Sequence, residues 1–425
     1  MSAISMERSK QSAVPTQPKT LFSEWWSHPL ASFYLVLASV VLLSVFGLVA
    51  VASASSVWSH FDDGNSWAYT IRHLSFMGGG ALIVWAMAFT NEKFLRRIAW
   101  VGFFLAVILL VLVFVPGIGR EYYGNRSWVN FGFMQFQPSE PAKAALVLWS
   151  AALFAQWQQR LDNLKWLGMF LAGSGLIVAL VLLEKDVGTV CVLAMIMLAM
   201  LWFVGAPFWK VILPIIALGG AGVLGLVIFS AERLGRFAAF FAGIPGLGRF
   251  FEGVHASTSD QPLNSVYGLA SGGWWGLGIG ASRQKWGGLY NGAQTDYVFS
   301  VIGEELGLVG SFLVIFLFCV LVFAGVRICI RSATLFYKMA AIGMTAWLGV
   351  QAVVNIFVAL NLLPVVGLPL PFLSYGGSAL LAEAIAVGVL LACARHEPQA
   401  MAALRVKRAV SPVVTGVVAA PRTKS

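Results

Sequence analysis

Residues 297–327 read YVFSVIGEELGLVGSFLVIFLFCVLVFAGVR, an apolar stretch of 31 residues with two adjacent glutamates near its start. As a single helix it would be about 46 Å long, which exceeds the roughly 30 Å hydrocarbon core of a bilayer. We therefore expect it either to project outward or to bend near Gly303 and Gly307. Residues 308–327 alone would span, so Asp296 is expected near the outer membrane surface.

The rest of the chain has the same apolar character. Of its 425 residues, 59% are hydrophobic and 11% are charged, and the mean hydropathy is +0.82. This composition excludes a soluble single domain and intrinsic disorder, because so little polar surface could not cover a globule. The first apolar segment is too long for a cleavable signal peptide. The sequence predicts an all-α polytopic membrane protein of about ten transmembrane helices, at residues 31–53, 70–90, 97–116, 139–156, 165–183, 187–206, 208–230, 297–327, 337–360 and 376–394.

Lysine and arginine residues set the expected orientation. With both termini cytoplasmic, most of them fall on the inner side, as the positive-inside rule requires. The net charge of +10 then reflects basic cytoplasmic loops and not nucleic-acid binding. Residues 231–296, between the seventh and eighth helices, form a large extracytoplasmic loop that is too aromatic for disorder and is expected on the membrane surface. The predicted domains are a cytoplasmic tail at 1–29, a membrane domain at 30–395 and a disordered basic cytoplasmic tail at 396–425.

Several common functional motifs are absent from the sequence. There is no Walker loop, no His-Glu-x-x-His and no Asp-x-Asp metal pair, and the four cysteines lie in or beside apolar runs. What remains is a set of ionisable residues on the expected outer side of an apolar bundle. Such residues near membrane depth are usually functional. The alternative is that they only pair with one another and fix the packing of the helices.

The first set of polar residues surrounds the start of the fourth expected helix. Arg126 precedes the motif QPSEPAK, which begins at Gln137. Ser139 is a natural N-cap, Glu140 lies at the positive end of the helix dipole, and Lys143 follows on the same face, where it can pair with Glu140. A well-capped helix start explains most of this pattern but not a lysine at membrane depth. A structural and a functional interpretation both stay open.

Two further sets lie between expected helices. A charged hairpin turn from Glu184 to Asp186 needs no functional explanation. Gln351 and Asn355 precede the segment LPVVGLPLPFLSYGGS, residues 363–378, whose prolines and glycines mark stiff, irregular backbone. Such backbone is tolerated at membrane depth only where protein or a water-filled cavity satisfies it. We interpret this segment as a cavity wall.

The last set joins the extracytoplasmic loop to the long apolar stretch. Arg283 and Lys285 precede Asp296, and Glu304 and Glu305 follow it. A lone acid beside basic residues at an outer membrane surface is an arrangement suited to binding an anionic lipid headgroup and catalysing a reaction on it. An ordinary helix cap is the alternative.

At these positions the sequence resembles the SEDS family (shape, elongation, division and sporulation), over residues 30–395. The family patterns are a Gly-x-x-Arg-Trp stretch leading to QPSExxK, an acidic turn ending DLGT, TDFIF followed by GEELG, and LPFxSYGGS. Each is recognisable here, and residues 282–286, SRQKW, resemble the division members more than the elongation members.

The resemblance implies a peptidoglycan glycosyltransferase that polymerises lipid II into glycan strands at the outer face of the cytoplasmic membrane, for septal synthesis in cell division. It implies a class B penicillin-binding protein as partner, together with other division proteins, and no nucleic acid. The family's catalytic aspartate falls on Asp296, and its Glu–Lys pair falls on Glu140 and Lys143.

This reaction needs a carboxylate to take the proton of the acceptor hydroxyl, and we assign that role to Asp296. The leaving diphosphate needs charge stabilisation, which arginine, lysine or a divalent cation such as Mg²⁺ or Mn²⁺ can supply. No other cofactor is implied. The candidate substrate-binding residues are Arg126, Glu140, Lys143, Arg283, Lys285 and Ser374.

Three departures from the family pattern surround Asp296. Residues 289–294 read LYNGAQ in place of YLPEAH, Gly288 stands where the family often has an acid, and Asn264 stands where it has a glutamine. Two other functions therefore stay open. A lipid II flippase should tolerate loss of one outer carboxylate better than a transferase does. A non-catalytic division scaffold is favoured by the altered loop.

Overall fold

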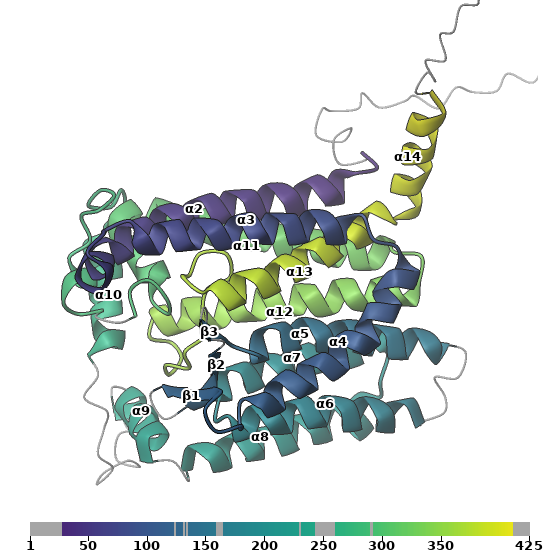
Figure 1. The fold of residues 1–425 in the computed structure, drawn as a ribbon, viewed down its shortest axis with the longest axis horizontal. Helices are drawn as coiled ribbons and strands as arrows, with labels where there is room; N and C mark the ends of the chain where they lie inside the picture. The colour runs from purple at the N-terminus through teal and green to yellow at the C-terminus, as the bar shows by residue number, and fades with distance from the viewer. Residues whose placement is uncertain are drawn as a thin grey trace, which may run out of the picture.

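The protein is a bundle of roughly parallel and antiparallel helices with a small sheet at one end (Figure 1). The computed structural model describes residues 28–122, 125–130, 132, 135–158, 165–228, 231–242, 260–289 and 292–410. A helix lies at each of the ten predicted positions: α2 (Ala31–Asp63), α3 (Ala68–Ala88), α4 (Glu92–Leu112), α5 (Ser139–Gln156), α6 (Lys165–Leu183), α7 (Val187–Val204), η2 with α8 (Phe208–Ile212 and Leu213–Ile228), α11 (Val298–Arg331), α12 (Leu335–Ala359) and α13 (Gly377–Arg395).

Eight of these helices, within the described ranges, are long and apolar enough to cross a membrane, so the prediction of a polytopic helical membrane protein is confirmed. The two others differ for physical reasons. Helix α5 has only 18 residues and carries Glu140 and Lys143. It is covered by neighbouring helices and not by lipid, which is why it tolerates these charges. The segment of η2 and α8 begins with a π-helical turn just before Pro214, which has no amide hydrogen to continue a regular helix.

The two ends of the described chain lie on the same side of the bundle. In Figure 1 the start of α2 and the short helix α14 (Pro398–Val410) lie at the right, whereas α9 (Ala231–Ala242), α10 (Gln261–Ser271) and the sheet lie at the left. Both ends on one side agrees with an even number of crossings. That this side is cytoplasmic stays a prediction from the lysines and arginines. Helices α12 and α13 are mostly buried, whereas few residues of α3 are.

Helix α11 is broken at Gly307, one of the two glycines at which a bend was predicted. Gly307 has φ 67° and ψ −163°, a conformation that only glycine adopts readily. The break leaves backbone groups without helical partners, and the segment 273–278 supplies them. The amides of Leu277 and Gly278 donate to the carbonyls of Glu304 and Glu305 at 2.9 and 3.0 Å. The amide of Leu308 in turn donates to the carbonyl of Gly273 at 2.9 Å.

The chain between α4 and α5 contains a small antiparallel sheet that the sequence analysis did not predict. Strands β1 (Gly119–Tyr122), β2 (Asn125–Asn130) and β3 (Gln135–Phe136) pair in the order β1-β2-β3. In β2, Ser127 and Val129 are buried while Trp128 between them is half-buried, the alternation expected of a strand. Strands of two to six residues carry too little of this alternation to be recognised in a sequence.

Two other local expectations were wrong. The N-cap of α5 is Pro138 and not Ser139, whose hydroxyl is buried without a hydrogen-bond partner within the described residues. The basic tail was expected to be disordered, but its first part forms α14, because Pro398 suits a first helical turn and the following residues are rich in alanine. Residues 1–27 and 411–425, which include the rest of both predicted tails, and residues 243–259 of the extracytoplasmic loop lie outside the described residues.

Gly307→Ala is expected to destabilise the protein by about 2–4 kcal/mol, since it strains the backbone and brings a methyl group 2.6 Å from the Trp274 carbonyl. Gly78→Ala is the matched control. Gly78 is helical and exposed, and the methyl group of an alanine there would have no neighbouring atom within 4 Å, so the change should be neutral or stabilising by up to about 1 kcal/mol. Thermal midpoints of the purified variants in detergent measure both. Equal thermal midpoints for Gly307→Ala and Gly78→Ala would contradict the conclusion that an alanine strains the backbone at the break.

Candidate active site

Asp296 lies in the turn that leads into α11, where its side chain is half-buried. Its backbone carbonyl accepts a hydrogen bond from Nδ2 of Asn355 in α12 at 2.8 Å. The preceding carbonyl, of Thr295, accepts one from the Ser374 hydroxyl at 2.5 Å. The carbonyl of Gln294 accepts one from the backbone amide of Tyr375 at 2.7 Å. Three consecutive carbonyls are therefore bound by groups from α12 and from the segment 363–376, which fixes the backbone that carries Asp296.

Ser374 was predicted to bind substrate. Its hydroxyl is 4% exposed and also accepts the backbone amide of Leu370 at 2.8 Å. One contact lies within its own irregular segment and the other lies on the Asp296 turn. This geometry favours a positioning role for Ser374.

Glu140 and Lys143 form a buried ion pair at the start of α5. The Lys143 Nζ atom lies 2.8 Å from Oε1 of Glu140, and the two side chains are 0% and 1% exposed. Lys143 also donates to Oε1 of Gln351 at 2.8 Å and lies 5.1 Å above the centre of the Trp347 ring. Glu383 of α13, fully buried and bonded to the Phe372 amide at 2.9 Å, is near enough to interact with both charges. The predicted pairing is thus present.

One face of α12 connects this ion pair to the Asp296 turn. Gln351 and Asn355 lie one helical turn apart, and both bind the irregular segment 363–376. Nε2 of Gln351 donates to the Pro369 carbonyl at 2.9 Å, and Nδ2 of Asn355 donates to the Leu368 carbonyl at 2.7 Å. Amide side chains from α12 therefore satisfy this irregular backbone, as the constraint on membrane proteins requires. That the segment also lines a cavity stays a prediction.

The three other predicted substrate contacts lie in different environments. Arg126 is half-buried in β2, and the Arg283 side chain is exposed in the loop before η4 (Gln284–Trp286). Lys285 is 4% exposed. Its Nζ atom binds Oε1 of Glu305 at 2.8 Å, the Ser53 hydroxyl at 2.8 Å and the Gly280 carbonyl at 2.9 Å. With its donors used inside the protein, Lys285 fits a structural role better than a substrate contact.

Two of the departures from the family pattern meet in space. Asn264 of α10 donates through Nδ2 to the Gly288 carbonyl at 3.3 Å. A β-carbon at Gly288 would lie 2.6 Å from Cγ of Asn264 and 2.5 Å from Oε1 of Gln284. A side chain at position 288 is therefore excluded by the residue at position 264. Tyr290 and Asn291, within the third departure, lie outside the described residues.

The charged turn between α6 and α7 contains another buried acid. Glu184 is 0% exposed, and neither of its carboxylate oxygens has a hydrogen-bond partner within the described residues. Burial, together with the nearby Asp186, raises the pKa of the Glu184 carboxyl to about 9. Asp186 itself caps α7 through the Thr189 amide at 2.9 Å and accepts from Nε2 of Gln137 at 3.1 Å. The turn thus ties α7 to the start of α5.

No metal site can be assigned from these residues. Within the described ranges, no three His, Cys, Asp or Glu side chains gather closely enough to hold a metal ion. The divalent cation expected at the diphosphate stays a prediction.

Comparison with known proteins identifies the family. A family model described as a cell cycle protein, named for FtsW, RodA and SpoVE, matches residues 33–399. This chain belongs to the FtsW, RodA and SpoVE family, that is, to the SEDS family. The resemblance noted in the sequence is therefore confirmed.

Individual SEDS proteins are similar over most of their lengths. "Probable peptidoglycan glycosyltransferase FtsW" of Mycobacterium tuberculosis is 35% identical over 393 residues, which cover 92% of this chain and 73% of the relative. Stage V sporulation protein E of Bacillus subtilis is 33% identical over 367 residues, or 86% and 96% of the two chains. Among solved structures, a chain of a peptidoglycan synthase complex that coordinates polymerization and crosslinking has a TM-score of 0.64 and 26% identity, covering 86% of this chain and 98% of its own. RodA of Thermus thermophilus has a TM-score of 0.60 and 26% identity over 85% and 96%.

Some residues of this SEDS site were not found from the sequence. Ser53 is one of several serines near the end of an apolar helix, and nothing near it in the sequence points to Lys285, which is 232 positions away. Glu383 could have been noticed as an isolated acid in the last apolar segment, since ionisable residues at that depth are rare.

Lys143→Met is expected to cost about 3–5 kcal/mol of stability, because it leaves Glu140 buried without its cation. The double variant with Glu140→Gln should recover part of this loss. Arg72→Met is the matched control: its pair with Asp63 is 3.3 Å long and largely exposed, so the cost should stay below about 1 kcal/mol. Thermal midpoints in detergent measure all three. A double variant no more stable than Lys143→Met alone would contradict the pairing argument.

Glu184→Gln is expected to remove a pH dependence of stability. The folded protein keeps the Glu184 proton up to a pKa of about 9, whereas the unfolded chain releases it near 4.5. The folded state therefore binds more protons in this window, and the free energy of unfolding falls as pH rises, by on the order of a few kcal/mol. The glutamine cannot ionise, so the thermal midpoint of the variant, relative to that of the wild type, should rise from pH 5 to pH 9.

The control for this comparison is Asp260→Asn, which changes an exposed acid that makes no side-chain cap at the start of α10. Its difference from the wild type should be the same at each pH. If the thermal midpoints of Glu184→Gln and the wild type changed with pH in parallel, the raised pKa of Glu184 would be disproved.

Proposed function

We propose that this chain is a peptidoglycan glycosyltransferase that polymerises lipid II at the outer face of the cytoplasmic membrane. The observation that carries the proposal is the Asp296 turn, whose backbone is bound by Asn355, Ser374 and Tyr375 while the carboxylate side chain remains partly accessible. A reacting group needs this combination of a fixed backbone and access to substrate. The names of the FtsW relatives support the same activity.

In this reaction Asp296 acts as the general base. Its carboxylate takes the proton of the 4-hydroxyl of the acceptor sugar as that oxygen attacks the anomeric carbon of the donor. A glycosidic C–O bond forms, and the bond from the anomeric carbon to the diphosphate oxygen breaks. The lipid diphosphate leaves with the electron pair, and the configuration at the anomeric carbon inverts. The proton stays on Asp296 until solvent removes it.

The leaving diphosphate requires positive charge at the same site. The candidates are Arg283, which is exposed, and Arg126, which is half-buried, because arginine binds phosphates in a bidentate manner. Lys143 is fully buried and paired. It therefore supports the site by holding α5 against α12. A divalent cation, if bound, would add charge stabilisation for the same group.

The partner proposed for this chain is a class B penicillin-binding protein, which would crosslink the new strands. The similar chain from a peptidoglycan synthase complex that coordinates polymerization and crosslinking supports this assignment. Assembly with other division proteins and a location at the division septum belong to the same proposal, and the description of the matching family model as a cell cycle protein supports them.

A lipid II flippase is the second candidate, and the buried Glu140–Lys143 pair favours it. Charges inside a membrane bundle often mark a transport path. These two charges are bonded to each other and to Gln351, however, which leaves the pair without exposed surface. The transferase is therefore the better supported function.

The test is polymerisation of labelled lipid II by the purified protein with its candidate penicillin-binding partner. The wild type is expected to form glycan polymer, and Asp296→Asn is expected to lose activity by about 10²–10⁴-fold, since the amide cannot accept the proton. Asp260→Asn, which changes an exposed acid in the same extracytoplasmic loop, is the matched control and should retain activity.

Polymer from both the wild type and Asp296→Asn would keep the enzyme and reject Asp296 as its base. With an active partner and folded protein, absence of polymer from the wild type would favour the flippase or the scaffold.

A further inference from the structure

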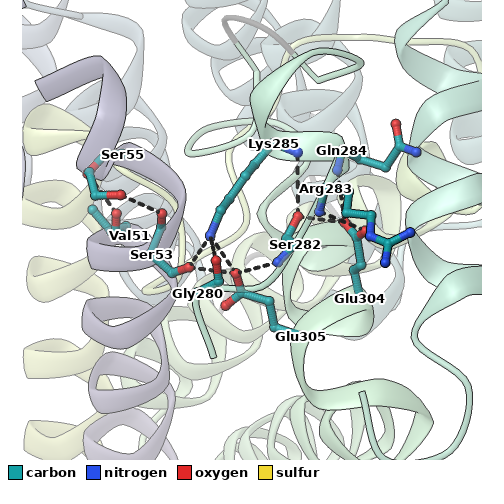
Figure 2. Close-up of polar contacts among 11 residues, drawn as sticks. Val51, Ser53, Ser55, Gly280, Ser282, Arg283, Gln284, Lys285, Glu304 and Glu305 are labelled. Carbon is teal, nitrogen blue, oxygen red and sulfur yellow. Dashed lines mark hydrogen bonds and ion pairs between the residues drawn. The ribbon is translucent and has the colours of Figure 1, made fainter. Parts of the chain in front are cut away.

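Two adjacent carboxylates of α11 hold the loop that precedes Asp296 (Figure 2). Glu304 accepts the Ser282 hydroxyl at 2.5 Å and the backbone amides of Arg283 and Gln284 at 2.9 and 3.3 Å. Figure 2 shows these donors converging on one carboxylate, with the Arg283 guanidinium on the side away from α2. Glu304 is 1% exposed, so its charge is stabilised by these donors and not by water.

Glu305 makes the second attachment, on the side of α2. Its Oε1 atom accepts from Nζ of Lys285 at 2.8 Å, from the Ser53 hydroxyl at 2.6 Å and from the Ser282 amide at 3.3 Å. The ion pair is 3% and 5% exposed. The four residues 282–285 are therefore attached to α11, and through Ser53 to α2.

A succession of tight turns leads from this attachment to Asp296. The Leu289 amide donates to the Gln284 carbonyl at 2.8 Å, and the Ala293 amide donates to the Leu289 carbonyl at 3.0 Å. The Tyr297 amide then donates to the Gly292 carbonyl at 3.0 Å. The second of these hydrogen bonds starts at Leu289, where the first ends, and the third starts at Gly292, next to the end of the second. Fixing the backbone at Gln284 therefore also limits the movement of the backbone toward Asp296.

This loop needs outside restraint because of its composition. Gly287, Gly288 and Gly292 lie between Gln284 and Asp296. Glycine has the largest backbone freedom to lose, so ordering such a segment costs more than usual. The attachments of Asn355 and Ser374 hold only the end nearest Asp296.

We propose that Glu304 and Glu305 are positioning residues for Asp296, acting through the loop 282–296. The inference rests on the proposed function of Asp296 as the base. The two carboxylates touch no reacting atom. They fix the far end of the loop, while Asn355 and Ser374 fix the near end, so that the Asp296 carboxylate keeps one location relative to the acceptor hydroxyl. A displacement of about 1 Å at a reacting group can cost 10²-fold in rate.

The experiment compares Glu304→Gln and Glu305→Gln with the wild type by amide hydrogen exchange and by lipid II polymerisation. Glu397→Gln is the matched control, since Glu397 is also 1% exposed but lies beside Arg331, 3.9 Å away, between α13 and α14. In the Glu304 variant, exchange should rise at residues 283–284 and also at 289–297. We expect kcat to fall at least about tenfold with KM changed less than about threefold, the pattern of a misplaced base with intact substrate binding.

A milder variant keeps the test valid if a buried glutamine prevents folding. Ser282→Ala removes one donor to Glu304 without burying a new polar group, and it should change exchange and kcat in the same direction by a smaller factor. Faster exchange confined to residues 283–284, with 292–297 unchanged, would overturn the proposal. So would a kcat loss no larger than that of Glu397→Gln. If the wild type forms no polymer, the proposed function fails, and the exchange data still decide whether these carboxylates order the Asp296 loop.

Discussion

The break in α11 at Gly307 is the constraint on which the end of the bundle that carries α10 and the Asp296 turn depends. Inside a membrane protein, backbone groups released from a helix cannot turn to water, so another part of the chain must bind them. The segment 273–278 does so, and this requirement holds the extracytoplasmic loop against α11. Once the loop lies there, residues 282–285 come within reach of the Glu304 and Glu305 side chains. The same two glutamates thus bind the loop twice, through their carbonyls at the break and through their carboxylates above it.

The two buried lysines follow a second rule, that each is bonded to several groups at once. Lys143 binds Glu140, Gln351 and the face of Trp347, and Lys285 has a similar set of partners. A buried pair of this kind gains little over an apolar pair of the same shape, because removing two charges from water is costly. Its value lies in fixing which helices meet. At the start of α5 it determines how that helix faces α12, the helix that also holds the Asp296 turn.

Much of this arrangement could be predicted from the sequence, and the limits have physical causes. Long apolar segments predicted all ten helices. The length of 297–327 predicted either an outward projection or a bend near Gly303 and Gly307, because the span of a bilayer is fixed, and the structure has a break at Gly307. The pairing of Glu140 with Lys143 was predictable, since the two are one helical turn apart. The bond between Ser53 and Lys285 was not, because it joins positions 232 residues apart. The structural role of Lys285 follows only from that distant contact, and a basic residue in an outer loop otherwise suggests a substrate contact.

The contact between Asn264 and Gly288 has a consequence for how this loop can change over time. A β-carbon at position 288 would lie within 2.7 Å of the Asn264 side chain, so the family's acid cannot return there while Asn264 stays in place. Whether a substitution at one of these positions is tolerated depends on the residue at the other, which makes the two an epistatic pair. A glutamine at position 264 would keep a Cβ and a Cγ beside Gly288, so importing both family residues together would still require α10 and the loop to move apart.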